Sequence, residues 1–147
     1  MADDDLSMGY LVHWAGRLLR RLADRKLKAI GLTSGHLPVV NALAQAEPMS
    51  QKALAEWASI EQPTMAATLA RMERDGIVER RPDARDRRVA LFSLTAATRG
   101  KIGALRMAVE EVNQEALSAL PADQRATFRH QLETMARAME KRLGEEL

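Results

Sequence analysis

The sequence of 147 residues contains no cysteine. This absence excludes disulfide bonds, a thiol-based redox switch and zinc sites with thiolate ligands. Aromatic residues make up only 3% of the chain, so leucine, alanine, valine and methionine must supply most of the core. With 46% hydrophobic residues, the chain can form one compact domain or two lobes that share a core.

Long hydrophobic runs are also missing. The longest uncharged run, residues 29–46, contains glycine, proline, histidine and asparagine, and it is too short and too polar to span a bilayer. No basic segment followed by an apolar one opens the chain, so no signal peptide is visible. We therefore expect a cytoplasmic protein without a membrane partner.

Positive and negative charges nearly balance. The chain has 22 lysine and arginine residues against 20 aspartate and glutamate residues, which gives a net charge of +2. Any binding to nucleic acid must therefore depend on where the basic residues are concentrated. They are concentrated in residues 17–28 and 71–88, whereas the N-terminal MADDDL is acidic.

Arrangements typical of enzymes and metal sites are absent from the sequence. No nucleophile is paired with a base, no glycine-rich phosphate loop is found, and no carboxylate pair falls on a predicted cleft. His13, His36 and His130 lack the spacing and the acidic companions of metal ligands. We therefore expect neither enzymatic activity, nor a cofactor, nor a metal ion.

Hydrophobic periodicity predicts a mainly α-helical chain. Apolar residues form two stripes along the first segment, so this helix should touch two surfaces. Glycines follow the first and the fourth segment, where they favour helix ends. The predicted helices in this part of the chain cover residues 8–30, about 34–46, 51–59 and 63–75.

Two short strands and long helices are predicted next. The segments GIVERR (76–81) and RVALFSL (88–94) have the composition of strands around an arginine-rich turn. After Thr95 the chain is predicted to be helical almost to its end, with Pro121 at the start of the last helix. Long amphipathic helices need partners, so the two ends should pack together and against a second copy of the chain.

Residues 50–75 predict two short helices joined by a tight turn. In the second helix, Met65, Leu69 and Met72 recur at helical spacing and form a buried face. The contrasting face has the small side chains, hydroxyls and arginine that suit close approach to a major groove and contacts with phosphates or guanine. Its residues are Pro63, Thr64, Ala67, Thr68 and Arg71. The alternative is an ordinary amphipathic hairpin in a helical bundle.

The predicted strands would project residues 83–88 as a wing beside this helix. Arg85 and Arg87 are candidates to reach a minor groove, whose negative potential attracts arginine. Because an aspartate repels phosphate, we expect Asp86 to brace a neighbouring arginine or to accept backbone N–H groups. The alternative is a solvated charged hairpin that contacts no DNA.

The segment TLARMERDGIVERRPDARDRRVALFSLT, residues 68–95, resembles the signature of the MarR family of winged-helix regulators, named for multiple antibiotic resistance. RMERDGIVERR, the D-x-R-D-x-R wing and the closing LT carry the resemblance. The family's helix order also fits the entire chain 1–147. The resemblance implies a winged helix-turn-helix lobe over residues 34–95 and a helical dimerisation lobe built from residues 7–30 and 96–147.

Such proteins are homodimers that bind pseudo-palindromic operators in double-stranded DNA, and we expect a transcriptional regulator of this kind, acting as a repressor. The resemblance places Gln51 at a helix start near the DNA backbone, residues 63–71 in the major groove, and Arg85 and Arg87 at the wing tip. Asp86 and Arg88 match the pair that braces the wing.

Two positions depart from the family pattern. Ala67 stands where many relatives have a larger polar or basic residue, so base readout would depend on Thr64, Thr68 and Arg71. Thr98 replaces a glycine often found three residues after the LT threonine. The second departure concerns the start of the following helix more than DNA binding.

Many members of the family release DNA when a small, often aromatic or phenolic, anion binds between the two lobes. The absence of cysteine excludes the peroxide-sensing branch. The expected effector-binding residues are Tyr10, His13, Trp14 and Arg17, within two turns of the first helix, and His36 near the second. Alternatively, Tyr10 and Trp14 belong to a dimer core, and His13 and Arg17 are solvated.

Two other functions stay open at this point. A winged helix can serve only as a protein-interaction module, or it can bind DNA without sequence preference or ligand sensing. Salt dependence separates a DNA-binding protein from a protein-interaction module. A dimer that contacts ~6 to 10 phosphates loses ~10³ to 10⁵ in affinity between 50 and 200 mM salt, and a protein-interaction module does not.

Overall fold

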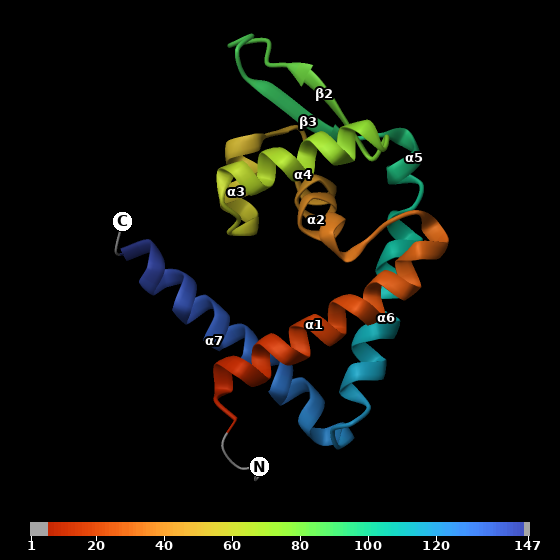
Figure 1. Ribbon diagram of the computed structural model, residues 1–147, viewed down its shortest axis with the longest axis vertical. Helices are drawn as coiled ribbons and strands as arrows, with labels where there is room; N and C mark the ends of the chain where they lie inside the picture. Colours follow the sequence, from red (N-terminus) through yellow and green to blue (C-terminus); the bar gives the residue numbers. More distant parts are fainter. Residues whose placement is uncertain (1–5, 146–147) are drawn as a thin grey trace. The chain divides into compact units, whose positions relative to one another are not determined.

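The computed structural model describes residues 6–145 (Figure 1). Its contacts divide the chain into two compact units, Met1–Glu110 and Glu111–Leu147, here called unit 1 and unit 2. The long helix α6, Ile102–Leu117, continues from one unit into the other. Among the described residues, no helix is long and apolar enough to cross a membrane.

Unit 1 begins with a long helix followed by three shorter ones, as the hydrophobic periodicity predicts. Two single-turn 3₁₀ helices, η2 and η3, stand between the first and the second. The bounds are α1 Met8–Leu27, η2 Lys28–Ile30, η3 Ser34–His36, α2 Leu37–Gln45, α3 Gln51–Ala58 and α4 Gln62–Arg74. The α-helix predicted up to residue 30 thus ends in a 3₁₀ turn, and the residues before Pro38 form another.

Local interactions fix the ends of these helices. The Ser50 hydroxyl accepts a hydrogen bond from the Ala53 N–H at 3.1 Å and so caps α3. Gly31 and Gly76 follow the first and the fourth helix with φ angles of 71° and 72°. A side chain would be strained in this left-handed conformation, which explains why glycine occupies both positions.

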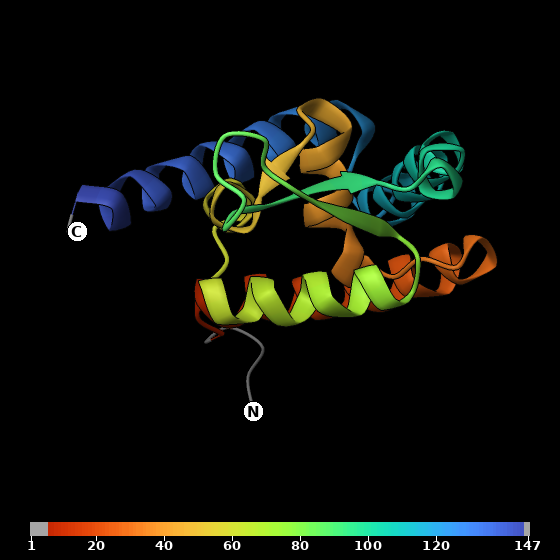
Figure 2. The ribbon, with the colours of Figure 1, turned by 90° about the horizontal axis from the view of Figure 1, so that it is seen from above.

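Unit 1 also contains a three-stranded antiparallel sheet (Figure 2). β2, Val78–Pro82, pairs with β3, Ala90–Leu94, from Val78 opposite Leu94 to Pro82 opposite Ala90. These are the two predicted strands, each slightly shorter than expected. The third strand, β1, is Met49–Ser50 and pairs with the other edge of β3. Two residues are too few to show a strand pattern, so the sequence does not predict β1.

The core of unit 1 packs α2 and α3 against the central strand β3, and α4 packs against α3 and β2. Met65, Leu69 and Met72 are all buried, which confirms the predicted inward face of α4. The other fully buried large side chains in this region include Leu27, Val39, Val40, Leu43, Leu54 and Leu94. Burial of these side chains is the main force that holds α4 to the unit.

Hydrogen bonds that the sequence does not predict hold the segment after β3 to the rest of unit 1. Thr98 is buried, and its hydroxyl donates to the Ile77 carbonyl at 2.8 Å. Glu47 lies in the loop before β1; its Oε2 accepts the Leu94 N–H at 2.9 Å, and its Oε1 accepts the Nε of Arg99 at 2.9 Å. These contacts join the end of α2, the sheet and the next helix.

The continuous helix predicted after Thr95 is interrupted. α5 covers Ala96–Arg99, and α6 begins only at Ile102. Gly100 lies at the break, where the Lys101 N–H bonds to the Thr98 carbonyl in a tight turn. Glycine is a poor helix former, so a helix divides there at low cost.

Unit 2 consists of the end of α6 and the last helix. α7, Arg125–Glu145, follows a single 3₁₀ turn, Ala122–Gln124, that begins after Pro121 as expected. Four apolar side chains recur along α7 and are 42–66% exposed: Phe128, Leu132, Met139 and Leu143. Met135, on the same face, is half-buried, so a single chain leaves most of this apolar stripe exposed.

Candidate nucleic-acid interface

The outer face of α4 has the residues expected of a DNA-reading helix. Pro63, Thr64, Ala67 and Arg71 are exposed, and Thr68 is half-buried. Arg71 donates through Nη2 to Thr68 Oγ1 at 3.4 Å, a long hydrogen bond that is readily exchanged for another acceptor. The helix thus presents small side chains, two hydroxyls and a weakly held guanidinium to the surroundings.

The beginnings of α3 and α4 are joined by a polar contact. Gln51 is the first residue of α3, as predicted, and its Nε2 donates to Gln62 Oε1 at 3.1 Å. Gln62 is the first residue of α4, one position before the proline predicted to begin that helix. The contact fixes two helix N-termini close together, and their free N–H groups suit anionic partners.

The wing between β2 and β3 is shaped by its two aspartates. Asp83 Oδ1 accepts the Arg85 N–H at 2.8 Å, and the Asp83 N–H donates to the Val89 carbonyl at 2.8 Å. Asp86 Oδ1 accepts the Arg88 N–H at 3.1 Å, as predicted for an aspartate at the turn. Both carboxylates therefore stabilise the loop backbone.

Asp86 also forms a bidentate salt bridge with Arg88. The Nε of Arg88 lies 3.0 Å from Oδ1, and Nη2 lies 3.0 Å from Oδ2. The bracing contact predicted from the sequence is thus present. The side-chain hydrogen bond from Arg88 lowers the pKa of the Asp86 carboxyl, so this group stays ionised and keeps its partner.

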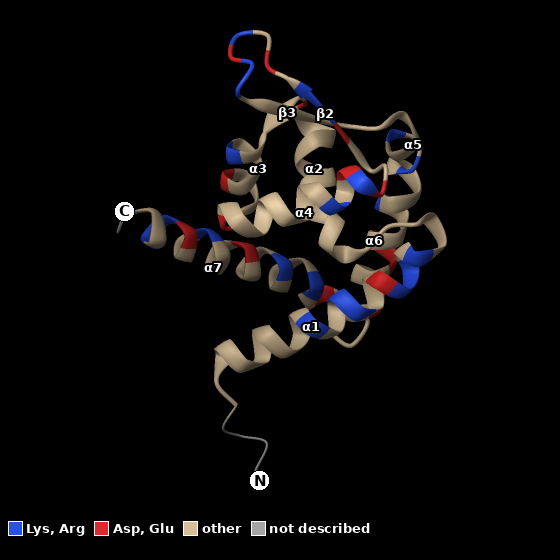
Figure 3. Ribbon diagram, turned by 45° about the horizontal axis from the view of Figure 1, so that its top comes forward, with Lys and Arg blue, Asp and Glu red and all other residues tan. Residues whose placement is uncertain are grey.

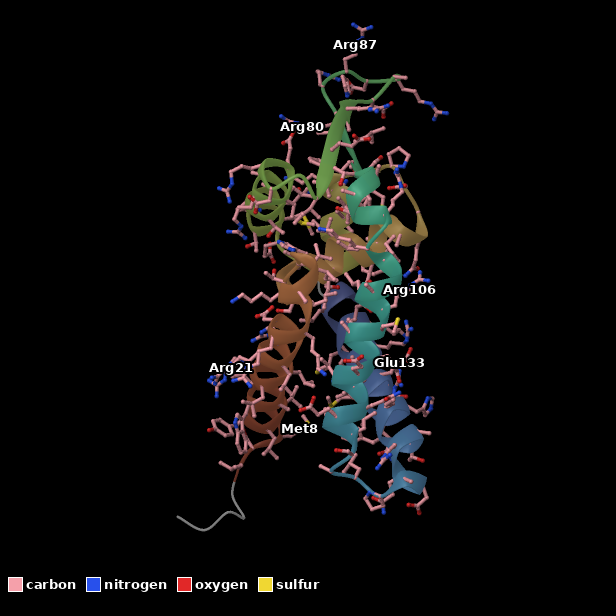
Figure 4. The ribbon with its side chains drawn as sticks, turned by 90° about the vertical axis from the view of Figure 1, so that its right-hand side faces the viewer. Met8, Arg21, Arg80, Arg87, Arg106 and Glu133 are labelled. Atoms are coloured by element: carbon pink, nitrogen blue, oxygen red, sulfur yellow. The ribbon has the colours of Figure 1, made fainter. Side chains whose placement is uncertain are left out.

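Arg85 and Arg87 are left available by this arrangement. Both side chains are exposed, and neither guanidinium has a hydrogen bond or ion pair with residues 6–145. Arg87 lies at the far end of the wing (Figure 4). The wing therefore combines a braced backbone with two free positive groups at its tip.

Two more arginines have carboxylate partners, and one of these pairs joins two elements. Arg80 on β2 pairs with Glu73 on α4 at 3.2 Å, and Arg81 pairs with Glu79 at 3.5 Å. The first pair ties the base of the wing to the end of α4. It joins two elements of the fold, so no local spacing in the sequence could indicate it.

The residues expected to bind an effector lie in two places. Tyr10 and Trp14 are exposed on α1 with ring centroids 6.3 Å apart, and His13 and Arg17 are exposed on the same helix. His36 lies near Asp24, which is about 10 Å further along the helix than Arg17. One chain therefore brings the four α1 residues together on one helix, but it does not bring His36 to them.

His36 has a structural role. Its Nδ1 accepts the Thr33 N–H at 3.1 Å and closes a capping box at the start of η3. Burial lowers the pKa of His36, and Arg71 lowers it further, while the carboxylates of Asp75 and Asp24 act in the opposite direction. The neutral ring is therefore favoured, in keeping with an Nδ1 that accepts a hydrogen bond.

An open hollow of about 440 Å³ is lined by the end of α2, Leu94, Arg99 and Ile102, and it includes none of the predicted effector residues. Within residues 6–145, no three histidine, aspartate or glutamate side chains gather as metal ligands would. The electropositive groups of α4 and the wing are the chemical feature that stands out.

Comparison with known proteins shows what the chain is similar to. A model described as the MarR family matches residues 30–89, which include α2, α3, α4 and the wing. The HTH-type transcriptional regulator YwoH of Bacillus subtilis is 28% identical over 119 residues, which are 81% of this chain and 86% of YwoH. The chain is thus similar to the MarR family in this region and to an HTH-type transcriptional regulator over most of its length.

Solved MarR structures share the fold over nearly the whole chain. A mutant MarR from E. coli complexed with operator DNA matches with a TM-score of 0.78 and 25% identity, over 87% of this chain and 92% of that one. A MarR family protein from Mycobacterium tuberculosis in complex with salicylic acid matches with a TM-score of 0.70 and 28% identity, over 91% of this chain and 99% of that one. The fold is thus that of the winged helix-turn-helix regulators of the MarR family.

Proposed function

We propose that this protein is a homodimer that binds a pseudo-palindromic operator and represses transcription by occupying it. Residues 34–95 would be the DNA-binding lobe, and residues 7–30 and 96–147 would form the dimerisation lobe. In each protomer α4 would enter the major groove, and the wing would reach the adjacent minor groove.

The observation that carries this proposal is the pairing pattern of the wing beside α4. Asp86 holds Arg88, while Arg85 and Arg87 are exposed and unpaired within the described residues. A hairpin that served only as a solvated surface would gain nothing from a braced backbone that keeps two arginines free. In the minor groove, these two groups would meet the strong negative potential that attracts arginine.

The outer face of α4 supports sequence-specific binding. Arg71 would form two hydrogen bonds with guanine, Thr64 and Thr68 would contact bases or phosphates, and Pro63 and Ala67 would allow close approach. Gln51 would contact the DNA backbone at the start of α3. The E. coli relative complexed with operator DNA supports the same use of this fold.

The proposed homodimer accounts for the exposed apolar side chains of the terminal helices. α1 exposes Tyr10, Leu11, Trp14 and Leu18, and α7 exposes the stripe described above. Apolar surface of this extent on a soluble chain usually marks an interface. A two-fold axis would set two copies of α4 about one helical turn of DNA apart, ~10 bp from centre to centre.

A small aromatic or anionic effector is the proposed signal for release. The relative from M. tuberculosis is in complex with salicylic acid, an aromatic carboxylate. In this chain, Tyr10 and Trp14 offer aromatic faces, and His13, Arg17 and His36 offer partners for a carboxylate. Salicylate is therefore the first probe to test.

Selection of bound DNA from a random duplex pool, at two salt concentrations, tests the proposal. An inverted repeat with half-sites about one helical turn apart is expected. Retention without a motif would mean non-specific binding, and no retention at low salt would favour a protein-interaction module. The recovered duplex then serves to test whether salicylate releases the protein and whether His13→Gln abolishes that response.

A further inference from the structure

α1 carries a row of positive charge that the fold does not use. Arg17, Arg21 and Arg25 lie on α1, and Lys28 begins the 3₁₀ turn η2 that continues it. They follow one another at intervals of four, four and three residues, so they lie along one face. All four are exposed, and none has an ion pair or hydrogen bond with residues 6–145. Like charges at this spacing repel each other and weaken a helix. An anionic partner outside the chain would relieve this repulsion.

The only acidic residue of α1 does not neutralise this row. Asp24 accepts the Ser34 N–H through Oδ1 at 2.6 Å, which holds α1 to η3. On η3, His36 is close enough to α4 for Arg71 and Asp75 to affect its pKa. The carboxylate is thus engaged in connecting α1, through η3, to the helix that would read DNA.

The same connection places the row on the side of unit 1 that α4 occupies. Figures 2 and 4 both show α1 and α4 on one side of the unit, with α2 behind them. Arg21 points outward on that side, whereas Arg106, on α6, points to the opposite side (Figure 4). Figure 3 shows that the basic part of α1 is the half that leads towards α2.

We propose that Arg17, Arg21, Arg25 and Lys28 bind backbone phosphates of the same DNA duplex whose major groove receives α4. The row spans about 16 Å of helix axis, and B-DNA carries one phosphate charge per ~1.7 Å, so several phosphates lie within reach. These contacts would position the protein and would carry no sequence information. This inference rests on the proposed function, because it needs the DNA complex to form.

The test compares Arg21→Gln and Arg25→Gln with Arg106→Gln as a matched control. Each variant loses one positive charge from an exposed position of unit 1, and only the first two lose it from the proposed phosphate-binding row. Affinity for the selected duplex is measured between 50 and 200 mM salt. Far-UV circular dichroism and the dimer mass confirm that each variant is folded and assembled.

The salt dependence gives the expected size of the effect. Each substitution removes one phosphate-binding charge from each protomer, so a dimer neutralises two fewer phosphates. The slope of log affinity against log salt then becomes shallower by about 1.8, since each neutralised phosphate contributes ~0.9. The wild-type protein should therefore lose about 12-fold more affinity than Arg21→Gln over this fourfold change in salt. The base preferences recovered by selection should be the same for both.

The outcomes separate this inference from the proposed function. If Arg21→Gln and Arg25→Gln both keep the slope of Arg106→Gln while the wild-type protein binds its operator, the row serves another partner and only the inference fails. If the wild-type protein binds no DNA at low salt, the proposed function fails, and the inference fails with it.

Discussion

Replacing Glu47 by alanine should destabilise the protein more than any other change to an acidic residue described above. Its carboxylate accepts the partly buried Leu94 N–H at 2.9 Å and pairs with the Arg99 guanidinium. The side chain of Glu47 is only 26% exposed, and that of Arg99 is 48% exposed. One residue thus connects the loop before β1 with the end of β3 and with α5.

The expected magnitude follows from those two contacts. A hydrogen bond to a charged group contributes about 1.5–3 kcal/mol, and leaving the Leu94 N–H without an acceptor forfeits that amount. The pair with half-exposed Arg99 adds about 0–1 kcal/mol after solvent screening. Glu47→Ala should therefore cost about 2–4 kcal/mol, whereas Glu47→Gln, which keeps an acceptor oxygen for Leu94, should cost about 1 kcal/mol.

Urea denaturation at a fixed protein concentration measures these differences, because the proposed dimerisation would make stability depend on concentration. Glu56→Ala is the matched control: Glu56 is 68% exposed, and its partner Lys52 lies 3.9 Å away. The control should change stability by less than about 0.5 kcal/mol. If Glu47→Ala matches Glu56→Ala, the contacts of Glu47 do not stabilise the fold; if Glu47→Gln is as damaging as Glu47→Ala, the Leu94 bond is not the main contribution.

Three further predictions concern DNA binding and pH. Arg71→Ala should relax preference at one base position by ~1–3 kcal/mol, whereas Arg87→Ala should weaken binding to all sequences; repeated selection and titration with scrambled duplexes distinguish the two. Asp86→Ala should lower DNA affinity, because the wing loses its brace. The urea midpoint should stay unchanged, because the partner Arg88 is exposed and such a pair adds little stability. Unchanged DNA affinity would mean that the pair does not shape the wing. Because the pKa of His36 is lowered below its ordinary 6.5 in the fold, the unfolded chain binds this proton first, and stability should fall as pH decreases through about 6.5; His36→Gln should remove that part of the pH dependence.

Much of the fold could be predicted from local patterns. The helical period locates α1 to α4, and the spacing of Met65, Leu69 and Met72 identifies which side of α4 is buried, because burial and periodicity express the same geometry. The strand β1 could not be predicted, because it depends on a residue far along the chain: Met49 pairs with Phe92. The sequence prediction misses the break at Gly100 although its sign is local, a glycine inside the predicted helix.

In the candidate site, too, local contacts could be predicted from the sequence and contacts between different elements could not. The Asp86–Arg88 pair lies within two residues of sequence, and an aspartate next to arginines predicts it by simple charge and turn chemistry. The pair of Arg80 with Glu73 and the bond of Glu47 to Leu94 connect different elements, so sequence spacing contains no sign of them. The sequence suggests an effector-binding role for His36, and the structure gives its Nδ1 a capping role that only the conformation of η3 creates.

The pairing of charges explains how a chain with a net charge of only +2 can present a basic surface to DNA. Several carboxylates of unit 1 are held by internal partners: Asp24 by Ser34, Glu47 by Arg99, Glu73 by Arg80, and Asp86 by Arg88. The guanidiniums of Arg85 and Arg87 and the α1 row have no such partners among the described residues. Since a free cation attracts phosphate and a paired one is largely neutralised, the distribution of partners determines the DNA-binding surface more than the sum of charges does.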